Sequence, residues 1–206
     1  ETKVLDLGTG SGAIALAIAH EAPHVAVTAT DQSSEALEIA QTNAKLLHLI
    51  SRIQFAQGSW YSALQPDERF DIILSNPPYI ASEDKHLHRG DLRFEPISAL
   101  TDHAGGLTCL EIIIAGATKR LNANGLIAVE HGFDQSNAVV AIMQAAGQRD
   151  VIGTVNATHF CLATRGLNQN GGFISGNDYS GHTASATSES LGLATCTNDT
   201  NGLFQR

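Results

Sequence analysis

The run Lys3-Val4-Leu5-Asp6-Leu7-Gly8-Thr9-Gly10-Ser11-Gly12 decides the fold of this chain. Its first half is short and almost continuously apolar, which predicts a strand. Its second half is a glycine-rich turn, and the helix-forming run Ala13–Ala22 follows directly. A strand, a glycine turn and a helix in this order are what the crossover of a nucleotide-binding fold needs.

The rest of the sequence continues this alternation of strands and helices. The short link between the last two predicted strands indicates an antiparallel hairpin, because parallel neighbours need a crossover of about a dozen residues. We therefore expect an α/β fold: a Rossmann-like, mostly parallel seven-stranded sheet with one antiparallel strand and helices on both faces. The further strands are predicted at Val25–Thr30, Ile53–Ala56, Phe70–Leu74, Leu126–Glu130, Asp150–Thr154 and His159–Thr164. Three further helices are predicted. The first is capped by Ser33 or Ser34 and has apolar positions at Leu37, Ala40, Ala44 and Leu47. The second has apolar positions at Leu107, Leu110, Ile114, Ala117 and Leu121, and the third spans Val139–Ala146.

One long stretch, Ala81–Ala104, shows no period and is predicted to be a loop. Loops of this length inside a compact domain are usually functional. The histidines His86, His88 and His103 have no acid or cysteine at ligand spacing, so we expect solvated histidines there and no metal site.

The composition limits the function classes. The 206-residue chain has a formal net charge of −9, from 12 Lys and Arg against 21 Asp and Glu. This balance argues against stable nucleic-acid binding, since a grip on the backbone neutralises phosphates. The three cysteines form no CxxC pair, which favours a reduced, cytoplasmic protein over a disulfide scaffold. The longest apolar run, Ala13–Ala19, is too short to span a bilayer, so we expect no membrane association.

A change of composition after Arg165 predicts the domain boundary. Of the 40 residues from Leu167 to Arg206, 21 are Gly, Ser, Thr or Asn. We assign residues 1–165 to one folded domain and 166–206 to a flexible or non-native tail. Because the chain starts at Glu1 and enters a strand almost at once, we expect it to be a fragment that lacks its amino-terminal part.

A second decisive stretch, Ser75-Asn76-Pro77-Pro78-Tyr79, follows the predicted strand Phe70–Leu74. Each proline fixes its φ near −65° and has no backbone donor, so this corner is stiff and its carbonyl groups stay unpaired. The Asn76 side-chain oxygen and the Pro77 carbonyl can accept from a planar NH2 group, with Tyr79 as a wall. Amides and the exocyclic amines of bases both carry such a group. An ordinary proline-rich turn is the alternative interpretation.

The glycine turn by itself admits more than one ligand. Gly8, Gly10 and Ala13 also satisfy the G-x-G-x-x-G/A pattern of dinucleotide folds, whereas a P-loop is excluded because no Gly-Lys-Ser/Thr follows. Asp6 before the first glycine and a third glycine at Gly12 favour S-adenosylmethionine. With that spacing the chain passes beside the amino-acid portion of S-adenosylmethionine instead of the pyrophosphate of a dinucleotide.

Asp31 ends the second predicted strand, 19 residues after Gly12. An acid at this place can accept both hydroxyl groups of a ribose. A helix-capping aspartate is the alternative.

Several motifs occur together in residues 1–165. They are Asp6-Leu7-Gly8-Thr9-Gly10-Ser11-Gly12, Asp31, Trp60 after Gly58-Ser59, Ser75-Asn76-Pro77-Pro78-Tyr79-Ile80, and Arg93-Phe94-Glu95-Pro96 with Ala99-Leu100. Together they resemble the catalytic domain of the protein-release-factor glutamine N5-methyltransferases. Asn-Pro-Pro-Tyr is shared with amino-methyltransferases that act on adenine and guanine. Phe94-Glu95-Pro96 and Glu130-His131-Gly132 point to the release-factor branch.

This resemblance implies a class I methyltransferase fold, S-adenosyl-L-methionine as methyl donor and a peptide chain release factor as protein substrate. It implies cofactor contacts from Asp6, Gly8, Thr9, Gly10, Ser11, Gly12, Asp31, Gln32, Trp60 and Asn76. It implies substrate contacts from Asn76, Pro77, Pro78, Tyr79, Phe94 and Glu95, with Asn76, Pro77 and Tyr79 as the catalytic residues. Two departures from the family are the missing helical N-terminal domain and the shortened charged segment around Gly153–Thr158.

The expected function is therefore methyl transfer to the side-chain amide nitrogen of a glutamine in a release factor. One alternative is an amino-methyltransferase for adenine or guanine in nucleic acid, for which we would expect an added basic recognition domain and against which the acidic balance argues. The other is an inactive cofactor-binding scaffold, against which the intact Asn76–Tyr79 motif argues.

Overall fold

The computed structural model describes residues 1–84, 96–153 and 160–165. The chain divides into two units, Glu1–Gly172 and Phe173–Arg206, and every element described below lies in the first. The predicted tail, 166–206, lies outside the described residues, so the boundary at residue 165 stays a prediction.

Strands and helices alternate along the first unit. The described strands are β1 (Lys3–Leu7), β2 (Ala26–Asp31), β3 (Ile53–Gln57), β4 (Phe70–Ser75), β5 (Leu121–Glu130), β6 (Arg149–Gly153) and β7 (Phe160–Arg165). The α-helices are α1 (Ala13–Glu21), α2 (Ser34–Leu46), α3 (Ile97–Leu100), α4 (Thr108–Arg120) and α5 (Ser136–Ala145), with 3-10 turns at Ile50–Arg52 and Trp60–Ala63. Among the described residues, no helix has the length and apolar character that crossing a bilayer requires.

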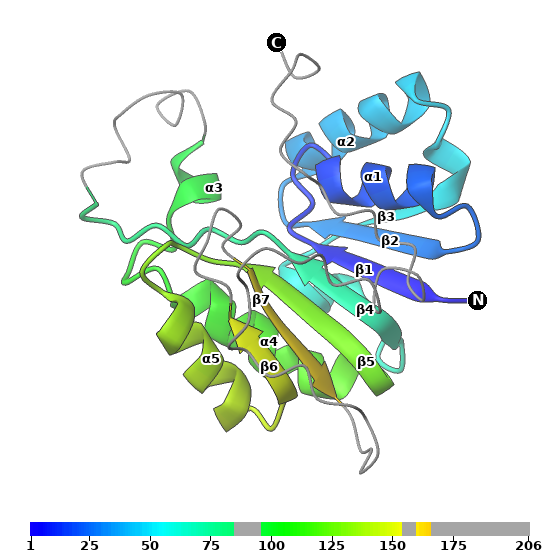
Figure 1. Ribbon diagram of the computed structural model, residues 1–206. Helices are drawn as coiled ribbons and strands as arrows, with labels where there is room; N and C mark the ends of the chain where they lie inside the picture. The colour runs from blue at the N-terminus through cyan, green and yellow to red at the C-terminus, as the bar shows by residue number, and fades with distance from the viewer. Residues whose placement is uncertain (85–95, 154–159, 166–206) are drawn as a thin grey trace, which may run out of the picture. The chain divides into compact units, whose positions relative to one another are not determined.

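The described strands form one sheet in the order β3-β2-β1-β4-β5-β7-β6 (Figure 1). Parallel pairing joins β1 to β2 and β4, β2 to β3, and β4 to β5. In contrast, β7 runs antiparallel to both of its neighbours, β5 and β6. The predicted α/β fold and the predicted antiparallel hairpin are confirmed.

The two faces of the sheet carry separate hydrophobic clusters. Along β1, Val4 belongs to one cluster and Leu5 to the other, and Ile72 and Ile73 divide in the same way along β4. Since successive side chains of a strand point to opposite faces, the clusters lie on opposite faces of the sheet. The Leu5 cluster contains buried residues of α4 and α5, and the Val4 cluster contains residues of α1 and α2. Helices therefore cover both faces, as predicted.

The predicted boundary between a helix and the next strand is wrong. Leu121 was expected to be the last apolar position of a helix, but α4 ends at Arg120 and Leu121 begins β5. Asn124 has a φ of 62°, and the β4–β5 register shifts between Phe70 and Ile72, so β5 begins irregularly. Strand propensity did not reveal the first half of β5, because it contains Asn122, Asn124 and Gly125, and Asn and Gly are rare in regular strands.

Two further expectations were wrong. Leu47, expected on the apolar face of a helix, is 57% exposed and lies just beyond the end of α2. The expected loop over residues 81–104 contains the short helix α3, and Ile80 forms an isolated parallel bridge with Thr101. A helix of four residues is too short to produce a period in the sequence.

The parallel strands β1, β2 and β4 end at the same edge of the sheet (Figure 1). The order of the strands switches between β1 and β4, because β1 has its successor β2 on one side and β4 on the other. In open α/β sheets ligands bind outside the carboxyl ends of the strands at such a switch point. The glycine turn follows β1 there, and the proline corner follows β4.

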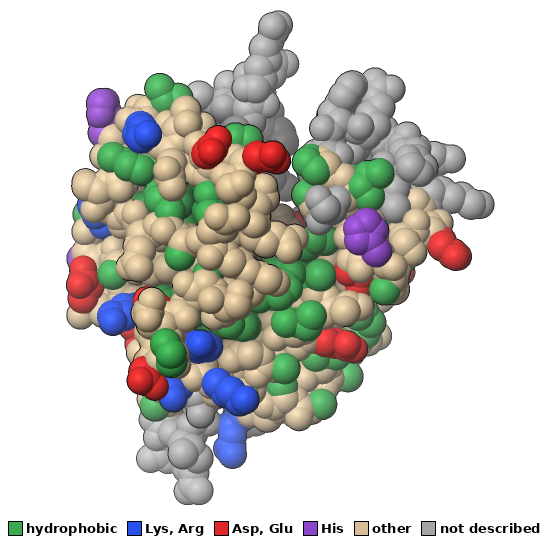
Figure 2. All heavy atoms as spheres, turned by 180° about the vertical axis from the view of Figure 1, so that it is seen from behind, with side chains coloured by type: hydrophobic (Ala, Val, Ile, Leu, Met, Phe, Trp, Pro, Cys, Tyr) green, Lys and Arg blue, Asp and Glu red, His purple; other side chains and the backbone are tan. Residues whose placement is uncertain are grey.

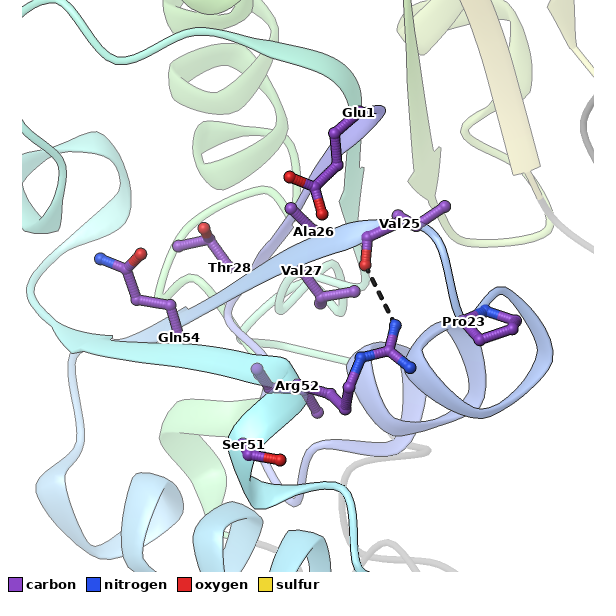
Figure 3. A pocket seen from close by; sticks show the side chains of 10 residues that line it. Glu1, Pro23, Val25, Ala26, Val27, Thr28, Ser51, Arg52 and Gln54 are labelled. Carbon is purple, nitrogen blue, oxygen red and sulfur yellow. Dashed lines mark hydrogen bonds between the residues drawn. The ribbon is translucent and has the colours of Figure 1, made fainter.

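A hollow of about 360 Å³ lies towards the opposite edge of the sheet. Figure 3 shows its lining from the amino-terminal halves of β2 and β3, with the Arg52 guanidinium donating to the Val25 carbonyl oxygen at 3.4 Å. None of the predicted site residues lines it.

Candidate functional site

The glycine turn has a backbone that only glycine adopts without strain. Gly8, Gly10 and Gly12 have φ angles of 70°, 57° and 88°, which lie in the left-handed region. A Cβ atom on Gly12 would also approach the Ala40 Cβ to 3.1 Å, so this glycine lets α1 pack against α2. The N–H groups of Gly8 and Thr9 both donate to the Thr30 carbonyl oxygen at 2.9 Å. The turn is therefore anchored to the end of β2.

Asp6 is buried beneath this turn, with 1% of its surface exposed. Its Oδ2 atom accepts from the Thr9 hydroxyl at 2.6 Å and from the Ala15 N–H at 3.1 Å, which ties the turn to the first residues of α1. Its Oδ1 atom has no partner among the described residues. Burial raises the pKa of Asp6 to about 6, although the bonds from Thr9 and Ala15 oppose this shift and the nearby Asp31 carboxylate adds to it.

Asp31 lies at the end of β2 and contacts the glycine turn. Its Oδ2 atom accepts from the Gly10 N–H and its Oδ1 atom accepts from the Ser33 N–H, both at 2.9 Å. The N-cap of α2 is Ser33, whose hydroxyl oxygen accepts from the Ala36 N–H. The interpretation of Asp31 as the helix cap is therefore wrong. Gln32, the next residue, is exposed, and its carbonyl oxygen accepts from the Gln57 side chain.

Trp60 lies against the glycine turn although it is far away in the sequence. A Cβ atom on Gly8 would be 3.5 Å from the Trp60 Cζ3 atom, which is ordinary van der Waals contact, so the indole ring lies directly beside this glycine. Trp60 begins a 3-10 turn with a φ of 48°, which is uncommon for a residue other than glycine. Asp6, Asp31 and Trp60 thus lie around the glycine turn, and the cofactor contacts that the resemblance implies for them stay predictions.

The proline corner lies beside this turn because β4 pairs with β1. Ser75 is the partner of Leu7 in the parallel register, and the Ser75 hydroxyl donates to the Leu7 carbonyl oxygen at 2.7 Å. Asn76 is exposed and Pro77 is buried. Within the described residues, no protein donor bonds to the Asn76 side chain or to the Pro77 carbonyl oxygen. Both acceptors therefore remain available at the edge of the sheet.

Tyr79 is held at both its side chain and its backbone. The Tyr79 hydroxyl donates to Glu130 Oε1 at 2.8 Å, at the end of β5. The Tyr79 carbonyl oxygen accepts from Gln135 Nε2 at 2.9 Å. Its ring also packs against the Leu5 cluster. The Glu130 strand end, which the sequence singled out, therefore meets the proline corner directly.

Three residues that support this region were not predicted from the sequence. Asp102 accepts backbone N–H bonds from Ala104, Gly106 and Thr108 and so organises the loop before α4. Burial by itself would raise the pKa of Asp102, but these bonds outweigh it and hold the pKa below its usual value. Gly106 and Gln135 contact the backbone after the corner. Their partners lie 27 and 56 residues away from them, so no local pattern in the sequence revealed them.

Some predicted residues cannot be placed. Phe94 and Glu95 lie outside the described residues, as do His86 and His88, whereas His103 is exposed. The described residues contain no group of three His, Cys, Asp or Glu side chains that could hold a metal ion. Cys109 lies near the start of α4 and is half-buried.

The charges near the turn differ from those at the opposite edge. Asp6, Asp31 and Glu130 lie at the carboxyl ends of their strands. Arg69 precedes β4, and Arg120 ends α4, where it donates to the carbonyl oxygens of residues 65, 66 and 68. Most of the Lys and Arg side chains visible in Figure 2 lie in its lower half, where Asp and Glu side chains lie as well. Among the described residues, the charged side chains at the ends of β1, β2 and β5 are acidic.

Comparisons with known proteins agree with this arrangement. The family model described as "Methyltransferase small domain" matches residues 1–91. Release factor glutamine methyltransferases of Bordetella pertussis, Xylella fastidiosa and Neisseria gonorrhoeae are 52%, 54% and 51% identical to the chain over 149, 147 and 146 residues. These alignments cover between 70% and 72% of this chain and 53% or 54% of each relative. The chain thus spans about half the length of the curated relatives it matches.

Solved structures share the fold. A methyltransferase from Pyrococcus furiosus superimposes with a TM-score of 0.59 at 20% identity, over 80% of this chain and 75% of that one. A ribosomal protein L11 methylase from Lactobacillus delbrueckii subsp. bulgaricus gives a TM-score of 0.56 at 23% identity, over 79% of this chain and 68% of that one. The expected class I methyltransferase fold is confirmed by this likeness. The sequence identity to the curated relatives shows in addition that most of this chain is similar to release factor glutamine methyltransferases.

Proposed function

We propose that this chain is an S-adenosylmethionine-dependent methyltransferase that modifies the side-chain amide nitrogen of a glutamine in a peptide chain release factor. The curated relatives to which it is similar are named for this activity. One structural observation carries the proposal: Leu7 pairs with Ser75, so the glycine turn and the proline corner follow neighbouring strands at one edge of the sheet. A methyl donor and an amide acceptor need this proximity.

The residues around the turn fit a nucleoside that carries an amino-acid tail. A Cβ atom on Gly10 would meet no other atom within 4 Å, so there is open space beside the turn. Each Asp31 oxygen accepts one protein N–H and keeps a lone pair for a ribose hydroxyl. We assign the binding of S-adenosyl-L-methionine to Asp6, Gly8, Thr9, Gly10, Ser11, Gly12, Asp31, Gln32, Trp60 and Asn76.

S-adenosylmethionine supplies a methyl group attached to a positively charged sulfur. As the bond between carbon and the amide nitrogen forms, the bond between carbon and sulfur breaks, and its electron pair stays on the sulfur. The nitrogen then releases a proton to water. No strong general base has to act first, because the alkylated amide is far more acidic than the neutral one.

The proline corner would make the nitrogen of the substrate's glutamine amide reactive enough to accept the methyl group. This nitrogen is a poor nucleophile because its lone pair is delocalised into the carbonyl group. If the Asn76 side-chain oxygen and the Pro77 carbonyl each accept one N–H, they hold the nitrogen in place. They also favour the positive charge that develops on it in the transition state. The two acceptors are free of described protein donors, which supports this role.

The remaining substrate contacts follow from the corner. Pro78 and the Tyr79 ring would form the wall against which the planar amide lies. Phe94 and Glu95 are proposed to contact the backbone of the release factor, on the resemblance alone. Tyr79 is the best supported of these contacts, because its bond to Glu130 fixes its side chain.

The acidic strand ends support a protein substrate over nucleic acid. Binding of a nucleic-acid backbone requires basic side chains near the phosphates. Among the described residues, the charged side chains at the carboxyl ends of β1, β2 and β5 are all acidic: Asp6, Asp31 and Glu130. We also propose that residues 1–165 are the catalytic domain and that the chain acts in the cytoplasm, where release factors work.

The test is transfer of a labelled methyl group from S-adenosylmethionine to three acceptors: an intact release factor, a peptide of its glutamine-bearing loop, and duplex DNA. We expect label on the release factor, and a Gln→Ala release factor should receive none. Label on DNA alone would favour an amino-methyltransferase for bases. Cofactor binding without any transfer would favour a scaffold.

A further inference from the structure

The Gln135 side chain joins three segments at the carboxyl edge of the sheet. Its Nε2 atom donates to the Tyr79 carbonyl oxygen at 2.9 Å and to the Gly106 carbonyl oxygen at 3.3 Å. Its Oε1 atom accepts from the Gly132 N–H at 2.7 Å. The proline corner, the loop before α4 and the connection between β5 and α5 are thus bonded to one amide group.

The direction of this amide group is fixed by its partners. An amide NH2 has two hydrogens, one for each carbonyl oxygen, and the amide oxygen accepts the third bond. In the flipped orientation the oxygen would face two carbonyl oxygens and the NH2 group would face an N–H. Only the observed orientation satisfies all three bonds.

Gly106 leaves just enough space for this contact. It is buried, and its φ of 81° lies in the left-handed region. A Cβ atom there would lie 2.3 Å from the Tyr79 carbonyl oxygen and 2.7 Å from Gln135 Nε2. The Gly106 N–H is held in turn by Asp102 at 2.8 Å. The loop before α4 is therefore shaped to bring its backbone against the residue that ends the corner.

The position of Tyr79 determines the position of the proposed acceptors. Two consecutive prolines separate Asn76 from Tyr79, and each has a fixed φ, so the segment has few ways to bend. Ser75 anchors its other end to β1. A displacement of the Tyr79 backbone would therefore move Asn76 and Pro77 relative to the glycine turn.

We propose that Gln135 is a positioning residue for methyl transfer: its NH2 group holds the Tyr79 backbone and thereby sets where Asn76 and Pro77 meet the substrate amide. This inference rests on the proposed function. Among the described residues, no hydrogen bond joins Gln135 to the glycine turn or to Asp31, so its effect is expected on the transfer step and not on cofactor binding.

The experiment compares Q135E and Q135M with Q144M in otherwise complete chains. Glutamate keeps an acceptor for the Gly132 N–H but, when ionised, has no donor for the two carbonyl groups. Methionine removes all three bonds with little change in volume. Gln144 is an exposed residue on the same helix and is the matched control. The measurements are kcat and KM with release factor, calorimetric affinity for S-adenosylhomocysteine, and hydrogen exchange of the Gly132 amide by NMR.

We expect kcat to fall about tenfold to a hundredfold in both Q135E and Q135M, because small misplacements of reacting groups have effects of this size. The affinity for S-adenosylhomocysteine should stay within about twofold of the parent value. The Gly132 amide should exchange faster in Q135M and stay protected in Q135E. The control Q144M should match the parent in every measurement.

A Q135E variant with the parent's kcat would overturn the proposal, and so would an equal loss of kcat and cofactor affinity. If Q135M does not fold, Q135E still decides between these outcomes. A parent chain that methylates no release factor would contradict the proposed function itself. In that case faster Gly132 exchange in Q135M, with protection in Q135E, would still support the clamp on Tyr79.

Discussion

The Ser75 hydroxyl donates a hydrogen bond of 2.7 Å to the Leu7 carbonyl oxygen, between the last residues of β4 and β1. These residues are 68 positions apart in the chain and are also partners in the parallel ladder. The bond is buried, so water cannot replace it easily. It fixes the starting points of the glycine turn and the proline corner relative to each other.

Replacing Ser75 tests this connection. S75A removes a donor from a buried carbonyl group, and we expect the free energy of unfolding to fall by about 1 to 2 kcal/mol. Urea denaturation measures this change. Ser82 is exposed, so S82A should leave the stability within about 0.5 kcal/mol of the parent. Equal stabilities of S75A and S82A would show that the bond contributes little.

Asn76 and Asp31 are predicted to act on different steps. N76A should lower kcat about a hundredfold or more, because it removes an acceptor that stabilises the transition state, and leave cofactor affinity within a few-fold. D31A should weaken cofactor binding about tenfold or more, since it removes charge-assisted bonds to the ribose, and largely preserve kcat at saturation. Single-turnover kinetics and calorimetry separate the two effects. Similar losses of both quantities in N76A would contradict the acceptor role of Asn76.

Asp6 should make stability depend on pH. Its pKa of about 6 in the folded chain lies above the ordinary value of 3.8 for an aspartate. The folded state therefore holds the proton more tightly, and the resulting stability is fully present below about pH 4 and lost as the pH rises through about 6. The loss corresponds to about 3 kcal/mol. D6N mimics the neutral form, so its stability relative to the parent should rise by about this amount between pH 4 and pH 7.

Urea unfolding of the parent and D6N across that pH range measures this difference. D67N, which changes an exposed aspartate, is the control for the loss of one carboxyl group. A constant difference between the parent and D6N would mean that burial does not shift the titration of Asp6.

Gly116 should resist replacement although it lies inside a helix. Alanine usually stabilises a helix interior relative to glycine by about 1 kcal/mol. At Gly116, however, a Cβ atom would lie 2.2 Å from the Tyr61 Cε2 atom, and the Tyr61 hydroxyl is bonded to the Ile113 carbonyl oxygen. We therefore expect G116A to lower the free energy of unfolding by about 1 to 3 kcal/mol.

The double variant Y61A/G116A provides the control for this clash. Without the Tyr61 ring, the added methyl group meets no obstacle, so G116A should be neutral or stabilising in the Y61A background. A loss of the same size in both backgrounds would mean that the ring is not the cause.

Much of the candidate site was predictable because its residues lie where strands end. The strand, turn and helix of residues 3–22 follow from local composition, and the left-handed φ angles of Gly8, Gly10 and Gly12 match residues that tolerate them. The position of Asp31 after a strand predicted a contact with a ribose, which stays a prediction, and the structure adds its bond from the Gly10 N–H. The roles of Asn76 and Tyr79 in the reaction stay predictions.

Errors occurred where long-range contacts override local preference. Leu121 continues the helical period of apolar residues, but it pairs with Phe70 in the parallel ladder between β4 and β5. Leu47 fits the same kind of period but lies beyond the last turn of α2 and faces solvent. Period alone does not mark where a helix ends.

The sequence by itself determined the alternation of strands and helices, the glycine turn and the stiffness of the proline corner, because propensity, φ restriction and hydrophobic period act over a few residues. Only the tertiary structure decided that the corner lies beside the turn, that the Trp60 ring covers Gly8, and that Gln135 holds Tyr79. Each of these contacts joins segments far apart in the chain. They arise when the sheet assembles and buries its two faces, which no local pattern specifies.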